Sequence, residues 1–155
     1  MQSNKISQSV FKNIATLGFV GYLPIAPGTF GTLAAMLCFI YFRPSVSSHA
    51  LSLIIVAAAG IIASHHAEKI LNKKDSRHIV IDEFAGYAVS VIFLPTSTYH
   101  YYIAAFFLFR FFDILKPPPI RNIEKILKGG IGIMADDLLA GVFTNLILQA
   151  WILLK

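Results

Sequence analysis

The chain has 155 residues, of which 56% are apolar and only 14% are charged, against about 45–50% and about 25% in soluble domains. That composition, with 13 Phe and 6 Tyr residues, exceeds what one soluble core of this length could bury, so it favours a single domain over residues 1–155 in a lipid bilayer and excludes a disordered or ordinary secreted domain. The net charge of +5 suits an anionic membrane surface better than nucleic acid on so apolar a chain.

Five apolar segments, separated by polar or Pro- and Gly-bearing stretches, are predicted to be helices. They span residues 29–42, 50–64, 84–94, 99–115 and 138–154. Their lengths of about 16–26 Å fall short of the ~30 Å hydrocarbon core, so some must recruit flanking residues or enter without crossing. The predicted fold is an all-α integral membrane protein of four to five short hydrophobic helices. A soluble helical bundle is the alternative.

The charged residues are distributed unevenly over these segments. If the segments cross in turn, the N-terminus and the connections 64–82 and 116–136 share one side. All basic residues except Arg43 and Lys155 lie on that side or at the helix ends bordering it, and the positive-inside rule makes it cytoplasmic. All eight carboxylates fall there too. We therefore expect a polar site at the cytoplasmic face.

Five carboxylates lie where an apolar segment meets this face. They are Asp82 and Glu83 in IVIDEFAGY, Asp113 in FRFFDILKPPP, and Asp136 and Asp137 in GGIGIMADDLLAG. A carboxylate beside hydrocarbon is costly unless it is paired or metal-bound, so all five are candidates for a functional site. Helix capping is the alternative for Asp82 and Asp136, but it does not suit Asp113 near a helix C-terminus.

The same motifs carry cations and permit a metal ion. Arg110 precedes Asp113 by three residues, so the two share a helix face and can form either a structural ion pair or part of a site. With Lys116, Arg110 could bind phosphate. Oxygen ligands favour a hard cation such as Mg²⁺. A zinc site is disfavoured because the histidines are scattered and Cys38 is the single cysteine.

Two glycine-bearing stretches flank these motifs. In GYLPIAPGTFGTLAAM, prolines break any helix before Gly28 and Thr29, which can then open the next helix with free N–H groups that suit a phosphate. A plain turn with Thr capping is equally compatible. The glycines of residues 129–132 permit close backbone approach, or form only a flexible turn.

In this order, the four motifs resemble the bacterial phosphatidylglycerophosphatase A family. The similarity covers about residues 18–145 and is carried by residues 23–35, 79–87, 109–121 and 129–141. It implies a Mg²⁺-dependent phosphatase of the bacterial inner membrane, with its active site on the cytoplasmic side. Such an enzyme removes the terminal phosphate of phosphatidylglycerophosphate to give phosphatidylglycerol in phospholipid biosynthesis. Pro118 departs from the family, which usually carries an aromatic residue there.

The resemblance also suggests the five carboxylates as the acidic centre, with Arg110, Lys116 and Arg121 nearby to bind phosphate. We expect Asp113 and one member of each acidic pair to hold Mg²⁺, because adjacent helical residues diverge by about 100°. A remaining carboxylate would activate water, or Asp113 or Asp82 would form an aspartyl-phosphate.

Two other functions use similar residues. A membrane phospho-alcohol transferase would need a nucleotide-diphosphate site and a denser Asp/Gly/Arg pattern on one helix. A small carboxylate-using ion transporter would need charges near mid-membrane. Neither feature is found in the sequence.

Overall fold

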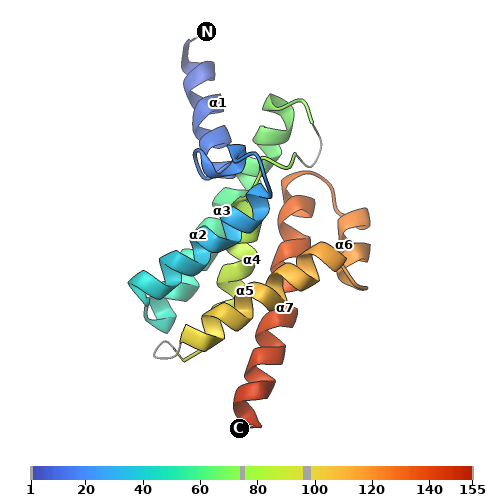
Figure 1. Cartoon of the computed structure of the whole chain (residues 1–155). Helices are drawn as coiled ribbons and strands as arrows, with labels where there is room; N and C mark the ends of the chain where they lie inside the picture. The colour runs from blue at the N-terminus through green and yellow to red at the C-terminus, as the bar shows by residue number, and fades with distance from the viewer. Residues whose placement is uncertain (1, 74–75, 96–98, 155) are drawn as a thin grey trace.

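The computed structural model describes residues 2–73, 76–95 and 99–154, and Lys74, Asp75 and Lys155 therefore lie outside the described residues. Within these ranges the chain forms seven α-helices, one 3₁₀ helix and no strand, so the predicted all-α fold is confirmed (Figure 1). The elements are α1 (Gln2–Ala15), η1 (Val20–Tyr22), α2 (Pro27–Phe42), α3 (Val46–Ile70), α4 (Ile81–Val91), α5 (Tyr99–Leu115), α6 (Ile120–Ile126) and α7 (Gly129–Leu153).

The helix count exceeds the four to five that were expected. The polar helices α1 and α6 were not predicted, because only apolar segments give a strong helix pattern in this sequence. The largest difference between a predicted and an observed helix start is in α7, which begins nine residues before its predicted start. Of the two alternatives for its glycines, close backbone approach is confirmed and a flexible turn is wrong, because a Cβ on Gly130 would lie 1.9 Å from the Ile61 carbonyl oxygen of α3. The glycines therefore allow α7 to begin in direct backbone contact with α3.

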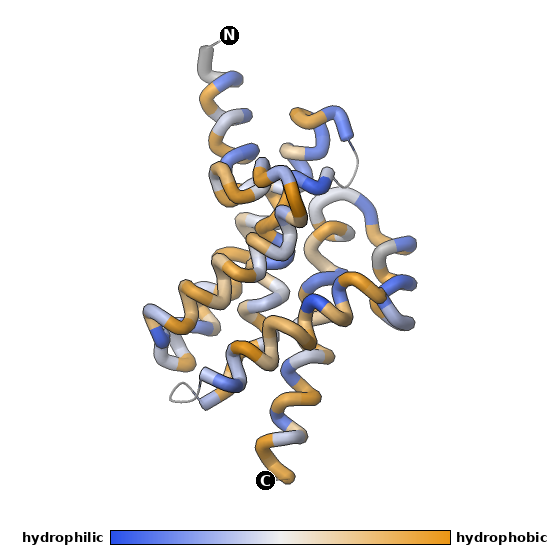
Figure 2. The backbone as a smooth tube through the Cα atoms, viewed as in Figure 1, coloured by the Kyte–Doolittle hydropathy of each residue, from blue (hydrophilic) through white to orange (hydrophobic). Residues whose placement is uncertain are grey.

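Two of the helices, α3 and α7, are long and apolar enough to cross a membrane. Each has 25 residues, or about 37 Å at 1.5 Å per residue. Hydrophobic residues dominate α2, the middle of α5 and the end of α7, whereas hydrophilic residues gather around the α3–α4 connection and α6 (Figure 2). The two ends of the helix bundle thus differ in polarity, as the charge distribution predicted.

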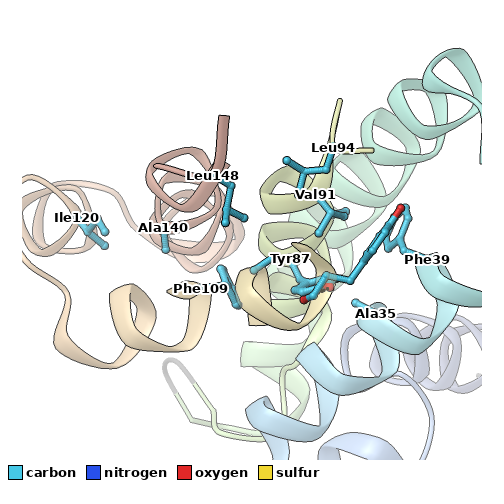
Figure 3. Close-up of a cluster of buried hydrophobic side chains, with 12 residues drawn as sticks. Ala35, Phe39, Tyr87, Val91, Leu94, Phe109, Ile120, Ala140 and Leu148 are labelled. Atoms are coloured by element: carbon cyan, nitrogen blue, oxygen red, sulfur yellow. Dashed lines mark hydrogen bonds between the residues drawn. The ribbon is translucent and has the colours of Figure 1, made fainter. Parts of the chain in front are cut away.

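The 11-residue helix α4 lies at the centre of the bundle (Figure 1). It contacts α2, α3, α5 and α7, most extensively α7. Its buried Tyr87 and Val91 meet Phe39 of α2 and Phe109 of α5 in one hydrophobic cluster (Figure 3). This packing sets where the first turn of α4, with its two carboxylates, lies.

Glycines allow α4 and α7 to touch backbone to backbone. A Cβ on Gly141 would lie 2.2 Å from the Gly86 carbonyl oxygen, and one on Gly86 would lie 2.6 Å from the Asp137 carbonyl oxygen. Small residues permit such close crossings in membrane helices. The crossing brings the acidic pair of α7 beside the start of α4.

Side chains satisfy the last carbonyls of α4, which ends after only three turns. Asn145 Nδ2 donates to the carbonyl oxygens of Ser90 and Ile92 at 3.0 and 2.7 Å. On the other side, His49 Nε2 lies 2.9 Å from the Ala88 carbonyl oxygen. Without these partners, free carbonyls would face an apolar interior.

We expect Gly141→Ala to lower the free energy of unfolding by about 1–3 kcal/mol, because the added methyl forces the two helices apart. Thermal unfolding in detergent micelles measures this. Val142→Ala is the matched control, since Val142 is exposed on the same helix. Equal shifts for the two variants would contradict a tight crossing.

Candidate active site

Asp82 and Glu83 lie in the first turn of α4. The turn is anchored by the Val80 amide, which donates to the Ala15 carbonyl at 2.9 Å. The N-cap is Val80, with no side-chain capping bond, so the capping interpretation of Asp82 is wrong. Acidic residues in a first turn are nevertheless stabilised by the positive end of the helix dipole.

Asp136 and Asp137 lie about two turns inside α7, which begins at Gly129, and both are buried. Asp136 is therefore no helix cap either. It accepts a hydrogen bond from Lys116 Nζ at 2.6 Å, and this ion pair joins α7 to the residue that follows α5. Asp113 lies near the C-terminal end of α5, as expected.

Three carboxylates converge on one point. Asp82, Glu83 and Asp137 each offer an oxygen, and these oxygens lie within 4.8 Å of one another. The expectation that adjacent residues would not face one ion is thus wrong for the first pair, because the longer Glu83 side chain reaches back toward Asp82. We call these three residues the carboxylate trio. Asp113 is not a member, although its carboxyl group interacts with that of Asp137.

The trio fits a hard metal cation. Asp82 Oδ1 and Glu83 Oε2 are buried and have no hydrogen-bond partner among the described residues. Buried polar atoms of this kind call for a ligand, and carboxylate oxygens are what Mg²⁺ prefers. A cation would also offset the repulsion between the three charges.

Arg110 of α5 lies between two acidic side chains. Its Nη1 donates to Asp113 Oδ2 at 2.5 Å and lies 3.9 Å from Glu83 Oε1. The predicted pairing of Arg110 with Asp113 is confirmed. The added contact with Glu83 links α5 to α4, so Arg110 contacts one carboxylate of the trio and the neighbouring Asp113.

A cavity of about 350 Å³ opens at this centre. Six acidic and three basic side chains line it, so an anionic ligand would meet a net negative wall unless a cation were bound. The charged lining residues are Glu68, Arg77, Asp82, Glu83, Asp113, Lys116, Lys128, Asp136 and Asp137.

Sequence reasoning missed three of these residues, namely Glu68, Arg77 and Lys128. All were on the predicted side of the membrane, and only that sidedness could have suggested them. Conversely, the structure does not bring Arg121 to the cavity. Its neighbour Ile120 is fully buried and anchors α6, which leaves the Arg121 side chain exposed.

Gly28 contacts the acidic centre from α2. A Cβ at this position would lie 2.0 Å from Glu83 Oε1, so the glycine makes room for that carboxylate. The N-cap of α2 is Ala26, without a side-chain bond, so the alternative of a turn with Thr capping is wrong. The anion that lies beside this helix end is the protein's own Glu83. Thr29 is half-buried and does not line the cavity.

The fold and site define a helical protein whose carboxylate-rich cavity lies where apolar helices end. The chain belongs to the phosphatidylglycerophosphatase A family, which it matches over residues 13–152.

Three relatives are similar over most of their length. A phosphatidylglycerophosphatase A of Escherichia coli is 37% identical over 135 residues, 85% of this chain and 78% of the relative. One of Haemophilus influenzae is 34% identical over 148 residues, 91% and 90% of the two chains. A Bacteroides thetaiotaomicron protein named as a candidate phosphatidylinositol-3-phosphatase is 36% identical over 143 residues, 86% and 89% of the two chains. No solved structure matches the chain.

We expect Gly28→Ala to weaken divalent-cation binding about tenfold or more, as changes beside metal ligands commonly do. The methyl displaces the flexible end of Glu83, so thermal stability should change little. Calorimetric titration with Mg²⁺, alongside thermal unfolding, separates the two effects. Thr29→Ala is the control, and an unchanged affinity in Gly28→Ala would contradict the assigned role of Gly28.

Proposed function

We propose that the protein is a Mg²⁺-dependent phosphatase that hydrolyses the terminal phosphomonoester of phosphatidylglycerophosphate, giving phosphatidylglycerol and inorganic phosphate in phospholipid biosynthesis. The observation that carries this proposal is the carboxylate trio, whose oxygens lie within 4.8 Å of one another. The cavity around the trio is also lined by three basic side chains, which can bind a phosphate. Membership of the family supports the reaction and the lipid. Neither the relatives nor the described residues support transferase or transporter function.

The names of the relatives agree on the kind of substrate. Phosphatidylglycerophosphate and phosphatidylinositol 3-phosphate both carry a phosphomonoester on a headgroup that a phosphodiester joins to the lipid. We take phosphatidylglycerophosphate as the substrate because the family description and two of the three relatives name it.

Asp82, Glu83 and Asp137 would hold the metal ion. When bound, Mg²⁺ supplies charge neutralisation on the phosphate oxygens as negative charge develops. Three carboxylates are enough, because Mg²⁺ commonly takes its remaining ligands from water and substrate phosphate.

The neighbouring residues act on water and phosphate. Asp113, oriented by Arg110, accepts a proton from the attacking water as the oxygen–phosphorus bond forms. The bond from phosphorus to the headgroup oxygen breaks, and that oxygen takes a proton from solvent. Lys116 has three N–H donors, so it can donate to the phosphate while Asp136 holds its ammonium group at 2.6 Å.

We further propose that α3 and α7 cross the inner membrane of a bacterium, with the active site on the cytoplasmic side. Their length and apolar composition support the crossing. The cavity is lined by residues of the α3–α4 connection and of the first turns of α7. Hydrophilic residues gather around that connection (Figure 2), and basic residues such as Arg77, Lys116 and Lys128, which line the cavity, favour the cytoplasmic side. Arg43 lies at the other end.

We expect the purified protein to release phosphate from phosphatidylglycerophosphate with Mg²⁺, to stop when the metal is chelated, and to recover when Mg²⁺ is restored. Asp82→Asn and Asp137→Asn should each lower kcat/KM about 100-fold or more, because the charge that binds the cation is removed. Asp113→Asn should lower kcat at least about 100-fold with little change in KM.

Lys125→Gln is the matched control, since Lys125 is exposed on α6 and does not line the cavity. Undiminished turnover after chelation would contradict the metal requirement. A higher kcat/KM with phosphatidylinositol 3-phosphate would contradict the lipid assignment.

A further inference from the structure

The cavity has two chemically different parts. The trio is deep, with Asp82 and Asp137 buried, whereas Arg77 and Lys128 line the cavity and are exposed. Its volume of about 350 Å³ lies in the range of pockets that hold whole small molecules. There is space for more of a headgroup than the phosphate at the trio.

Arg77 projects from a firmly held backbone. The preceding Ser76 is buried, and its carbonyl accepts from the Ile79 amide at 2.8 Å. The following His78 stacks on Tyr22, and its Nδ1 lies 2.7 Å from the Gly21 carbonyl oxygen. The backbone is therefore held at Ser76 and His78, the two neighbours of Arg77, which limits where its guanidinium can reach.

Lys128, which lines the same cavity, also projects from an anchored backbone. It is the N-cap residue of α7. The amide of the preceding Leu127 donates to the Ile123 carbonyl at 2.9 Å. Just beyond it, Gly130 lies against the Ile61 carbonyl of α3. The backbone on both sides of Lys128 is thus anchored, while its ammonium group remains in solvent.

These two basic side chains differ from the basic side chains beside the trio in their ion pairs. Arg110 and Lys116 are paired with Asp113 and Asp136 at 2.5 and 2.6 Å. No ion pair between described residues joins Arg77 or Lys128 to a carboxylate. Their charge is therefore available to a ligand in the cavity.

We propose that Arg77 and Lys128 form a second anion subsite, which binds the phosphodiester of the substrate while its phosphomonoester lies at the carboxylate trio. This inference rests on the proposed function. Guanidinium and ammonium groups bind phosphate oxygens through charge-assisted hydrogen bonds. The subsite selects lipids that carry two phosphates, because a lipid with one phosphate can occupy only one of the two positions.

The test compares the two parts of the cavity in the full-length protein. Kinetics of phosphate release from phosphatidylglycerophosphate are measured in uncharged mixed micelles with Mg²⁺, together with inhibition by inorganic phosphate. For the double variant Arg77→Gln/Lys128→Gln we expect KM to rise roughly tenfold or more, with kcat within about threefold. The inhibition constant of inorganic phosphate should stay within about twofold, because phosphate alone reports on the trio.

The matched control is Lys69→Gln/Lys125→Gln, which removes the same charge from exposed positions that do not line the cavity. Its KM should stay near the wild-type value, and Arg77→Lys/Lys128→Arg should restore most of the affinity. A parallel rise in KM and in the inhibition constant would place the two cations on the terminal phosphate and overturn the subsite. So would an equal rise in KM in the control, since that reports only general surface charge.

An active wild type with an unchanged KM in the double variant overturns the subsite alone. A wild type that releases no phosphate from the lipid overturns the proposed function as well, so the two failures are distinguishable.

Discussion

The repulsion between carboxylates at one end of the helix bundle is the constraint on which the rest of the structure depends. Asp82 and Asp137 of the trio are buried, and two further acids, Asp113 and Asp136, line the same cavity. Like charges in such surroundings cost several kcal/mol unless they are compensated. Arg110 and Lys116 offset the negative charges of Asp113 and Asp136. The positive end of the α4 dipole stabilises Asp82 and Glu83, which lie in its first turn. Asp82, Glu83 and Asp137 line the cavity, where the proposed cation would complete the charge balance.

Holding these charges together requires helices that cannot separate. Gly86 and Gly141 let α4 and α7 cross at backbone contact, so the first turn of α4 and Asp137 are fixed relative to each other. The far end of α4 contributes too, because Asn145 and His49 satisfy carbonyls that would otherwise disfavour so short a helix in an apolar interior. The geometry of the acidic centre thus depends on polar contacts about three turns away.

The sequence predicted the all-α fold, the bounds of α5 and the polarity of the two ends, because apolar runs and charge placement are local patterns. It did not predict where α7 begins, since only contact with α3 explains why glycines there are helical. The five acids could be predicted as candidates, but not that Asp82 and Glu83 face one point, which depends on side-chain conformation. Arg77 and Lys128 could not be assigned to the cavity from the sequence. They lie between α3 and α4 and between α6 and α7, and only the folded chain places both residues in the lining of one cavity.

The depth of the trio also bears on the substrate. Its oxygens come from the first turn of α4 and from the N-terminal part of α7, at the polar end of the bundle. The acyl chains of a lipid, by contrast, must stay in hydrocarbon. A phosphate joined directly to the acylated glycerol would draw those chains toward buried carboxylates, at a cost in desolvation for the acids. A phosphate at the end of a longer headgroup avoids this conflict, since the intervening phosphodiester then lies at the exposed cations. With the proposed membrane crossing, the place of the trio at the polar end of the bundle therefore favours lipids whose reacting phosphate is terminal.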